Sequence, residues 1–95
     1  MPLYFIASSQ NLRDEFRAIQ DRAKAQGMEV VVAKTLAMIL SQLESSPTAF
    51  GDPTFHYREL KLTNYVVTRE SVAVNYCVDE ARKIVYLRRI VWTAR

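Results

Sequence analysis

The sequence predicts a two-layer α+β domain made of an N-terminal strand, a helical hairpin and a three- to four-stranded antiparallel meander. Two observations support this prediction. Residues 8–45 carry apolar side chains at helical spacing, whereas residues 56–92 alternate with the period of two that is typical of strands. Elements segregated in this way favour helices packed on one face of an antiparallel sheet. The 95 residues suffice for one core, so we expect a single domain over 1–95.

The first part of the chain predicts a strand and then a helix. The run PLYFIAS is rich in aromatic and β-branched residues, which indicates a strand over residues 3–7. The serines and asparagine of SSQN can cap a helix, and Gly27 is suited to end it. Between them, one apolar helix face follows at i, i+4, i+7 and i+11, formed by Leu12, Phe16, Ile19 and Ala23.

The next segment predicts a second helix over residues 30–45. Three consecutive valines favour a strand locally. From Val32 onward, however, helical spacing is maintained, and Ser45, Ser46 and Pro47 end the pattern. We expect the apolar residues of this helix to pack on the sheet: Leu36, Ile39, Leu40 and Leu43.

After a predicted loop with the sequence SSPTAFGDP, the chain predicts the meander. Its strands are the runs HYRELKL, YVVTR, VAVNYCV and KIVYLRRIVW, with a turn at Thr63-Asn64. In the third run one face is apolar, formed by Val72, Val74, Tyr76 and Val78. The opposite face is smaller and partly polar, formed by Ala73, Asn75, Cys77 and Asp79. The helices should cover the apolar face and leave the other face open.

Composition narrows the classes of function. Cys77 is the single cysteine and His56 the single histidine, which excludes a cysteine-built metal site and disfavours a catalytic zinc centre. We therefore predict no metal and no cofactor, and interpret Cys77 as a small buried apolar residue. No apolar run is long enough to cross a bilayer, and the first residues lack a signal-peptide pattern. The expected location is cytoplasmic, without membrane contact.

Positive charge is concentrated in the C-terminal half. Residues 1–53 hold five basic and six acidic residues, for a net charge of −1. Residues 54–95 hold eight basic and four acidic residues, for a net charge of +4. This asymmetry indicates a nucleic acid or an acidic protein as partner, although a solvated surface explains it equally well.

The motifs Arg58-x-Leu60-Lys61, Tyr76-x-Val78-Asp79 and Ile84-Val85-x-Leu87-x-x-Ile90 add a resemblance. With the order and length of the elements, they make the chain similar to the RelE/ParE superfamily of bacterial toxins. These are the toxin halves of type II toxin–antitoxin pairs. The resemblance implies a small antitoxin as partner, and either a ribosome-bound messenger RNA or DNA gyrase as target.

The chain departs from the pattern of the ribonuclease members. There an arginine precedes the tyrosine of the third meander strand by three positions, and a histidine or arginine and a tyrosine follow the last strand. Here that first position is Ala73, and Val-Trp-Thr-Ala-Arg follows Ile90. Cleavage through the 2′-hydroxyl needs a base, an acid and a cation, and alanine supplies none of them. The resemblance therefore favours a toxin that acts by protein contact, as the ParE branch does on gyrase.

Two other functions stay open. An mRNA interferase with a rearranged site would use His56, Arg58 and Arg88 as catalytic groups. A small nucleic-acid-binding module would use basic residues of the sheet for phosphate contacts. We expect Arg88 and Arg89 to place one guanidinium on each face of the last strand. The residues predicted to contact a partner or nucleic acid are Lys61, Arg69, Arg88 and Arg89.

The predicted partner is a small acidic protein of antitoxin type. Open sheet edges expose unpaired backbone groups that invite another strand, and a helical hairpin presents a groove for an amphipathic helix. An acidic, partly disordered segment would be attracted to the basic half and fold on contact. Self-association into a homodimer is a further alternative.

Overall fold

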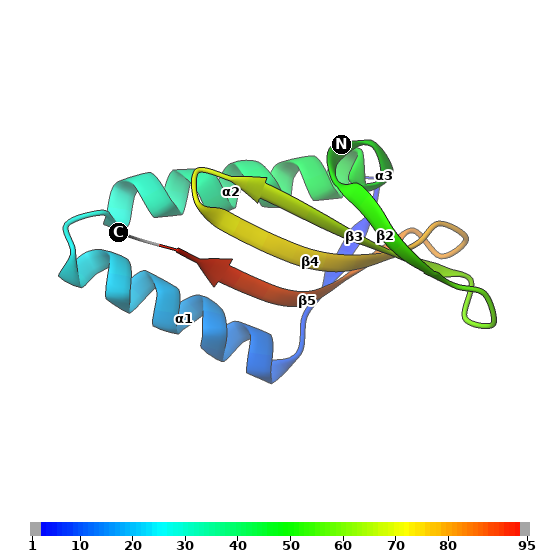
Figure 1. The fold of residues 1–95 in the computed structure, drawn as a ribbon, viewed down its shortest axis with the longest axis horizontal. Coiled ribbons are helices and arrows are strands. Elements are labelled where there is room, and N and C mark those ends of the chain that lie inside the picture. Colours follow the sequence, from blue (N-terminus) through cyan, green and yellow to red (C-terminus); the bar gives the residue numbers. More distant parts are fainter. Residues whose placement is uncertain (1–2, 94–95) are drawn as a thin grey trace.

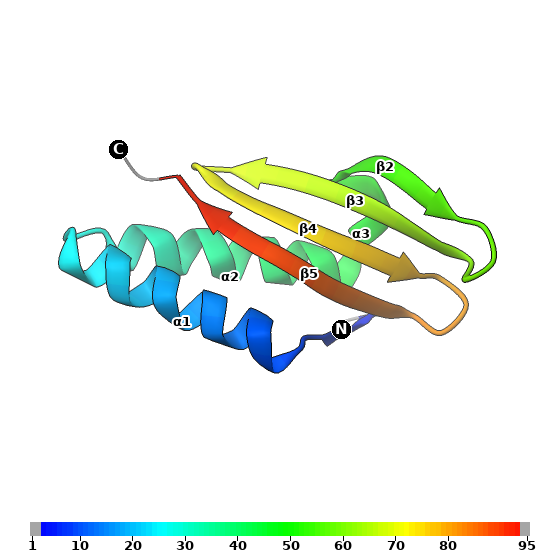
Figure 2. The ribbon, with the colours of Figure 1, turned by 60° about the horizontal axis from the view of Figure 1, so that its bottom comes forward.

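The computed structural model describes residues 3–93 and builds them into one sheet and three helices. The elements in chain order are β1 (Phe5–Ala7), α1 (Gln10–Ala25), α2 (Glu29–Ser45), α3 (Pro47–Phe50), β2 (Asp52–Tyr57), β3 (Leu62–Arg69), β4 (Val72–Asp79) and β5 (Ile84–Trp92). The two long helices lie side by side (Figure 1). They form one layer, and the sheet forms a second layer over them (Figure 2). The predicted two-layer α+β class is therefore confirmed.

The sheet has the strand order β1-β5-β4-β3-β2. Three consecutive hairpins join β2 to β5 with antiparallel pairing, which is the predicted meander. The N-terminal strand lies beside β5 in parallel, with Phe5 opposite Ile84. Strand β5 is therefore an interior strand, and β1 and β2 are the two edges.

Both long helices follow the predicted pattern. Ser9 caps α1, because its hydroxyl accepts the backbone N–H of Leu12 at 3.2 Å. Gly27 follows the helix with a φ of 71°, a left-handed conformation that glycine adopts without strain. Helix α2 begins at Glu29, and the strand preference of its valines is overridden because Val32 is buried in the core. Within residues 3–93, no helix is long and apolar enough to span a membrane.

The core lies between the helices and the covered face of the sheet. In β4 the predicted alternation is confirmed, because Val72, Val74, Tyr76 and Val78 are all at most 2% exposed. The members contributed by the helices include Leu12, Ile19, Ala23, Val32, Leu36, Ile39 and Leu43. Leu40, predicted to belong to this set, is only half-buried, because it faces a groove between the two helices.

Helix α3 occupies part of the segment predicted as a loop, and one hydrogen bond ties it to the sheet. The hydroxyl of Tyr76, whose side chain is fully buried, donates to the backbone carbonyl of Pro47 at 2.7 Å. Gly51 ends the helix directly beside this phenol, and a Cβ at that position would collide with the Tyr76 oxygen. The glycine is therefore required by a close approach.

The first strand of the meander differs from the prediction. It was predicted as HYRELKL with a turn at Thr63-Asn64, but β2 ends at Tyr57 and the turn is formed by residues 58–61. Lys61 adopts a positive φ of 54° there, which allows the chain to reverse. Thr63 and Asn64 lie inside β3, opposite Val78 and Cys77. The polar pair marks an interior strand segment and not a turn.

Candidate functional site

The face of the sheet opposite the helices carries a band of hydrogen-bonded polar side chains. The central residue is Asn64 of β3, whose amide nitrogen donates to the hydroxyl of Thr54 at 2.6 Å and to Oδ1 of Asn75 at 3.0 Å. Its own amide oxygen accepts from the thiol of Cys77 at 3.4 Å. Cys77 is buried, as predicted, but on this open face and not in the core under the helices. Three strands are thus cross-linked by side chains whose hydrogen-bonding capacity is largely used.

A β-bulge in β5 places both arginines on this face. Asn75 pairs with Arg89, but the next residue of β4, Tyr76, pairs with Leu87, so that Arg88 has no partner opposite it. The extra residue interrupts the alternation of side chains. Arg88 contacts Tyr57 and Cys77, which face the open side, and Arg89 lies beside Asn75. The prediction that the two guanidinium groups point to opposite faces is therefore wrong.

Arg88 is oriented by neutral groups. Its Nη1 donates to the hydroxyl of Tyr57 at 3.0 Å and lies 3.9 Å from the sulfur of Cys77. The hydrogen bond to Tyr57, followed by the one to Cys77, raises the pKa of Arg88 above its ordinary value. Within residues 3–93, neither Arg88 nor Arg89 forms an ion pair. Their positive charge is available to an external anionic group.

An apolar pocket of about 350 Å³ adjoins Arg88 on the same face. Two tyrosines and two leucines form its walls, and a thiol and a guanidinium complete its boundary. These residues are Tyr57, Leu60, Leu62, Cys77, Tyr86 and Arg88. Arg89, with the two asparagines, borders a second, more polar hollow that shares Tyr57 and Arg88. The open face therefore combines an apolar pocket, two cations and an amide band within a few strand spacings.

The structure separates the residues predicted as a rearranged catalytic site. His56 pairs with Thr63, which pairs with the core residue Val78, so His56 points to the helix side of the sheet. There its Nδ1 contacts the hydroxyl of Thr63 at 2.8 Å. Arg88 lies on the other face, and Arg58 lies in the exposed turn after β2. The three groups are not brought together.

Two other predicted contact residues lie at opposite ends of β3. Lys61 is exposed in the turn that precedes the strand, close in the chain to the apolar pocket. Arg69 ends the strand, and its guanidinium carbon lies 4.8 Å from the centroid of the Phe50 ring. Arg69, at the end of β3, is therefore several residues away from Arg88 of β5 in the strand direction. It packs on an aromatic ring, whose π-electrons stabilise a cation.

Asn64, Asn75 and Cys77 were not predicted as site residues. A signal for two of them was present in the sequence, because Asn75 and Cys77 were assigned to the partly polar face of their strand. Asn64 was missed because asparagine after threonine is typical of a turn. Their assembly depends on pairing between strands, which single-strand periodicity does not contain.

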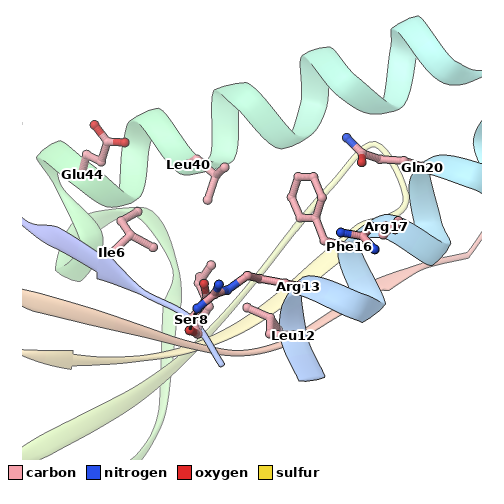
Figure 3. A pocket seen from close by; sticks show the side chains of 10 residues that line it. Ile6, Ser8, Leu12, Arg13, Phe16, Arg17, Gln20, Leu40 and Glu44 are labelled. Atoms are coloured by element: carbon pink, nitrogen blue, oxygen red, sulfur yellow. Dashed lines mark hydrogen bonds between the residues drawn. The ribbon is translucent and has the colours of Figure 1, made fainter. Parts of the chain in front are cut away.

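A separate groove of about 360 Å³ lies away from the open face, between α1 and α2 (Figure 3). Its apolar lining comes from four elements and includes Phe16 and Leu40, which point into the space from the two facing helices (Figure 3). The remaining apolar lining residues are Ile6, Leu12 and Leu87. Charged groups stand at the rim: Arg13 and Arg17 on α1, and Glu44 on α2. The groove predicted for the helical hairpin is thus present.

No protein-family model matches the sequence, and no curated protein matches it either. Among solved structures, a chain of the toxin–antitoxin complex RelBE2 from Mycobacterium tuberculosis is similar, with a TM-score of 0.70 and 19% sequence identity. The alignment covers 100% of this chain and 97% of that chain. The likeness shows that the two chains share a fold over the whole length of this chain.

Proposed function

We propose that this protein is the toxin-type component of a type II toxin–antitoxin pair, and that it acts on its target by protein contact and not by RNA cleavage. The observation that carries the proposal is the full-length structural likeness to a chain crystallised in a toxin–antitoxin complex. A fold by itself does not fix a function, so the proposal also draws on the two surfaces described above.

The groove between the helices supports an antitoxin partner. Five of its lining residues are apolar, and Arg13 and Arg17 stand on the α1 rim, with Glu44 on the α2 rim. An amphipathic helix with an apolar stripe and acidic flanks complements such a groove. Strand β2 adds an exposed sheet edge, where an extended segment of the same partner can pair with the backbone. A small acidic protein that folds on contact fits both surfaces.

The arrangement of the open face supports contact as the mode of action. Cleavage through a 2′-hydroxyl requires a base near the attacking oxygen, an acid near the leaving oxygen and a cation at the phosphate. The open face supplies cations in Arg88 and Arg89. The imidazole of His56 points to the other side of the sheet. A face with fixed cations, amides and an apolar pocket is suited to recognition.

One observation favours a second candidate, a ribonuclease with a rearranged site. The hydroxyl of Tyr57 and the guanidinium of Arg88 are 3.0 Å apart on the open face, so an acid and a cation are adjacent. Such an enzyme would lose cleavage in Tyr57→Phe and in Arg88→Gln. His56→Ala would retain cleavage, because that imidazole lies on the opposite face.

The test is expression in bacteria with and without the neighbouring reading frame. We expect growth arrest on expression of the protein alone, rescue by a small acidic neighbour, and co-purification of the two at low salt. Translating ribosomes incubated with the purified protein should leave the message intact by primer extension. If the message is cleaved within codons and this cleavage is lost in Arg88→Gln, the protein acts by catalysis and not by contact. A protein that purifies alone, or only with nuclease-removable RNA, contradicts the antitoxin pair.

A further inference from the structure

The apolar pocket on the open face is bounded by few polar groups, and two of them already form hydrogen bonds to neighbouring side chains. The Tyr57 hydroxyl accepts from Arg88, and the Cys77 thiol donates to Asn64. The rest of the lining is Leu60, Leu62 and the ring of Tyr86. A ligand group placed here gains contact with carbon and aromatic surface, but it meets few free donors or acceptors. This environment favours a side chain without polar atoms.

The rim of the pocket exposes apolar surface to solvent. Leu60 is 66% exposed in the turn after β2, and Phe55 is 59% exposed. The Phe55 ring packs edge-on against Tyr57, with 4.8 Å between the ring centroids. Contiguous exposed apolar surface beside a hollow is typical of an interaction site.

Arg88 forms one boundary of the pocket, and Arg89 is its neighbour along β5. The bulge directs both to the same side, and neither has an acidic partner within residues 3–93. Tyr57 and Cys77 hold Arg88 in place, so less side-chain entropy is lost when it binds an anion. A carboxylate is the anion that an arginine can bind with two parallel hydrogen bonds in a protein partner.

We propose that this surface binds an acidic peptide segment of the target protein, with one aromatic or long aliphatic side chain in the pocket and a carboxylate within three residues of it on Arg88 and Arg89. The inference rests on the proposed function and adds the chemical class of the target segment. A nucleobase fits less well, because its ring nitrogens and carbonyl groups would be buried against a lining that is mostly aliphatic and aromatic carbon. The two arginines fix the orientation of the segment, and the pocket selects its anchor residue.

The experiment is selection from a display library of random twelve-residue peptides on the purified wild-type protein. The double variant Leu60→Ala/Arg88→Gln serves as counter-selection, since both side chains are exposed and their removal leaves the core intact. We expect enrichment of peptides with a Phe, Trp, Leu or Met followed or preceded within three positions by Asp or Glu. Enriched peptides without this pairing, or equal enrichment on the double variant, would overturn the proposal.

Binding of one enriched peptide, labelled with fluorescein, is then measured by anisotropy. Arg88→Gln should weaken it about tenfold, the loss typical of a charge-assisted hydrogen bond. Leu60→Ala should weaken it about threefold to tenfold, whereas Leu3→Ala should not change it. Leu3 is a matched control, because it is also 66% exposed but lies before β1 at the opposite edge of the sheet. Equal losses in the two leucine variants would contradict binding in the pocket.

A fluorescein-labelled hexauridylate separates this ligand from RNA. We expect it to bind at least tenfold more weakly than the enriched peptide and to be insensitive to Leu60→Ala. Tighter RNA binding that depends on Leu60 and Arg88 would make this a nucleic-acid site and overturn the proposal. If the protein arrests growth and is neutralised by its neighbour but enriches no such peptide, this inference fails and the proposed function stands. If it neither arrests growth nor binds an acidic neighbour, the proposed function fails.

Discussion

The hydrogen bond from Tyr76 to Pro47 allows the contribution of the contact between α3 and the interior strand β4 to be measured. Tyr76→Phe keeps the buried ring but leaves the Pro47 carbonyl without its donor. An unsatisfied buried acceptor costs about 1–3 kcal/mol, so we expect the free energy of unfolding to fall by that amount. For a domain of this size the melting temperature should fall by about 4–8 °C per kcal/mol. The magnitude follows from the complete burial of Tyr76 and from the 2.7 Å length of the bond.

Urea unfolding followed by the fluorescence of Trp92, which is buried in the core, measures the change. Tyr86→Phe is the matched control, because Tyr86 is only half-buried and its hydroxyl has no hydrogen-bond partner within residues 3–93. The control should stay within about 0.5 kcal/mol of the wild type. If the two phenylalanine variants lose the same free energy, the bond to Pro47 does not contribute as argued.

The same phenol makes stability depend on alkaline pH. Burial raises the pKa of Tyr76 from 10.0 to about 12. Between these values the unfolded chain releases the proton while the folded protein retains it, so the free energy of unfolding falls as pH rises from about 10 to about 12. Tyr76→Phe should make this decline shallower. Burial also raises the pKa of Tyr65, so part of the decline should remain. Urea titrations at about pH 9 and about pH 11 compare the two proteins, and an unchanged slope would refute the assignment.

Five further substitutions test the fold and the site. Gly51→Ala should lower the free energy of unfolding in urea by about 1–3 kcal/mol, because the added Cβ meets the buried phenol of Tyr76. Gly27→Ala places its Cβ in open space and should cost about 1 kcal/mol, because the residue has a positive φ. Ile39→Ala, at a site 1% exposed, should cost about 2–5 kcal/mol, and a loss below that of the half-buried Leu40→Ala would contradict the assigned core. His56→Ala should leave both growth arrest and stability unchanged, and loss of arrest without loss of stability would return the imidazole to the functional site.

The order of the elements could be predicted because each has a periodicity that its own residues determine. The face of α1 that contains Leu12 and Ile19 and the buried face of β4 were both readable from spacing alone. The boundary between β2 and β3 could not be predicted, because the period-two pattern continues through the turn. The reversal depends on the left-handed conformation of Lys61. Glycine or asparagine would indicate such a conformation in the sequence, but this position holds a lysine.

The site was less predictable than the fold, since it is built from pairing between strands. Arg88 and Arg89 were recognised as candidates, but their shared orientation arises from a bulge that depends on the register of β5 against β4. Asn64 resembles a turn residue in sequence, and only the arrangement of three strands shows that its amide joins Thr54, Asn75 and Cys77. The hairpin motifs therefore predicted the architecture. The arrangement of side chains on the open face could not be predicted from them, because it depends on how the strands pair.

The parallel pairing of β1 with β5 joins two segments that lie far apart in the chain, so the sheet is completed late in folding. Residues 5–7 must wait for residues 84–86 before that pair can form, and both helices leave the ribosome while the sheet they cover is unfinished. Arg88 joins Tyr57 at the same late step. The groove between the helices is also completed then, because Leu87 of β5 and Ile6 beside it belong to its lining. The surface proposed to bind the target and the groove proposed to bind the antitoxin are therefore completed at the same step of folding.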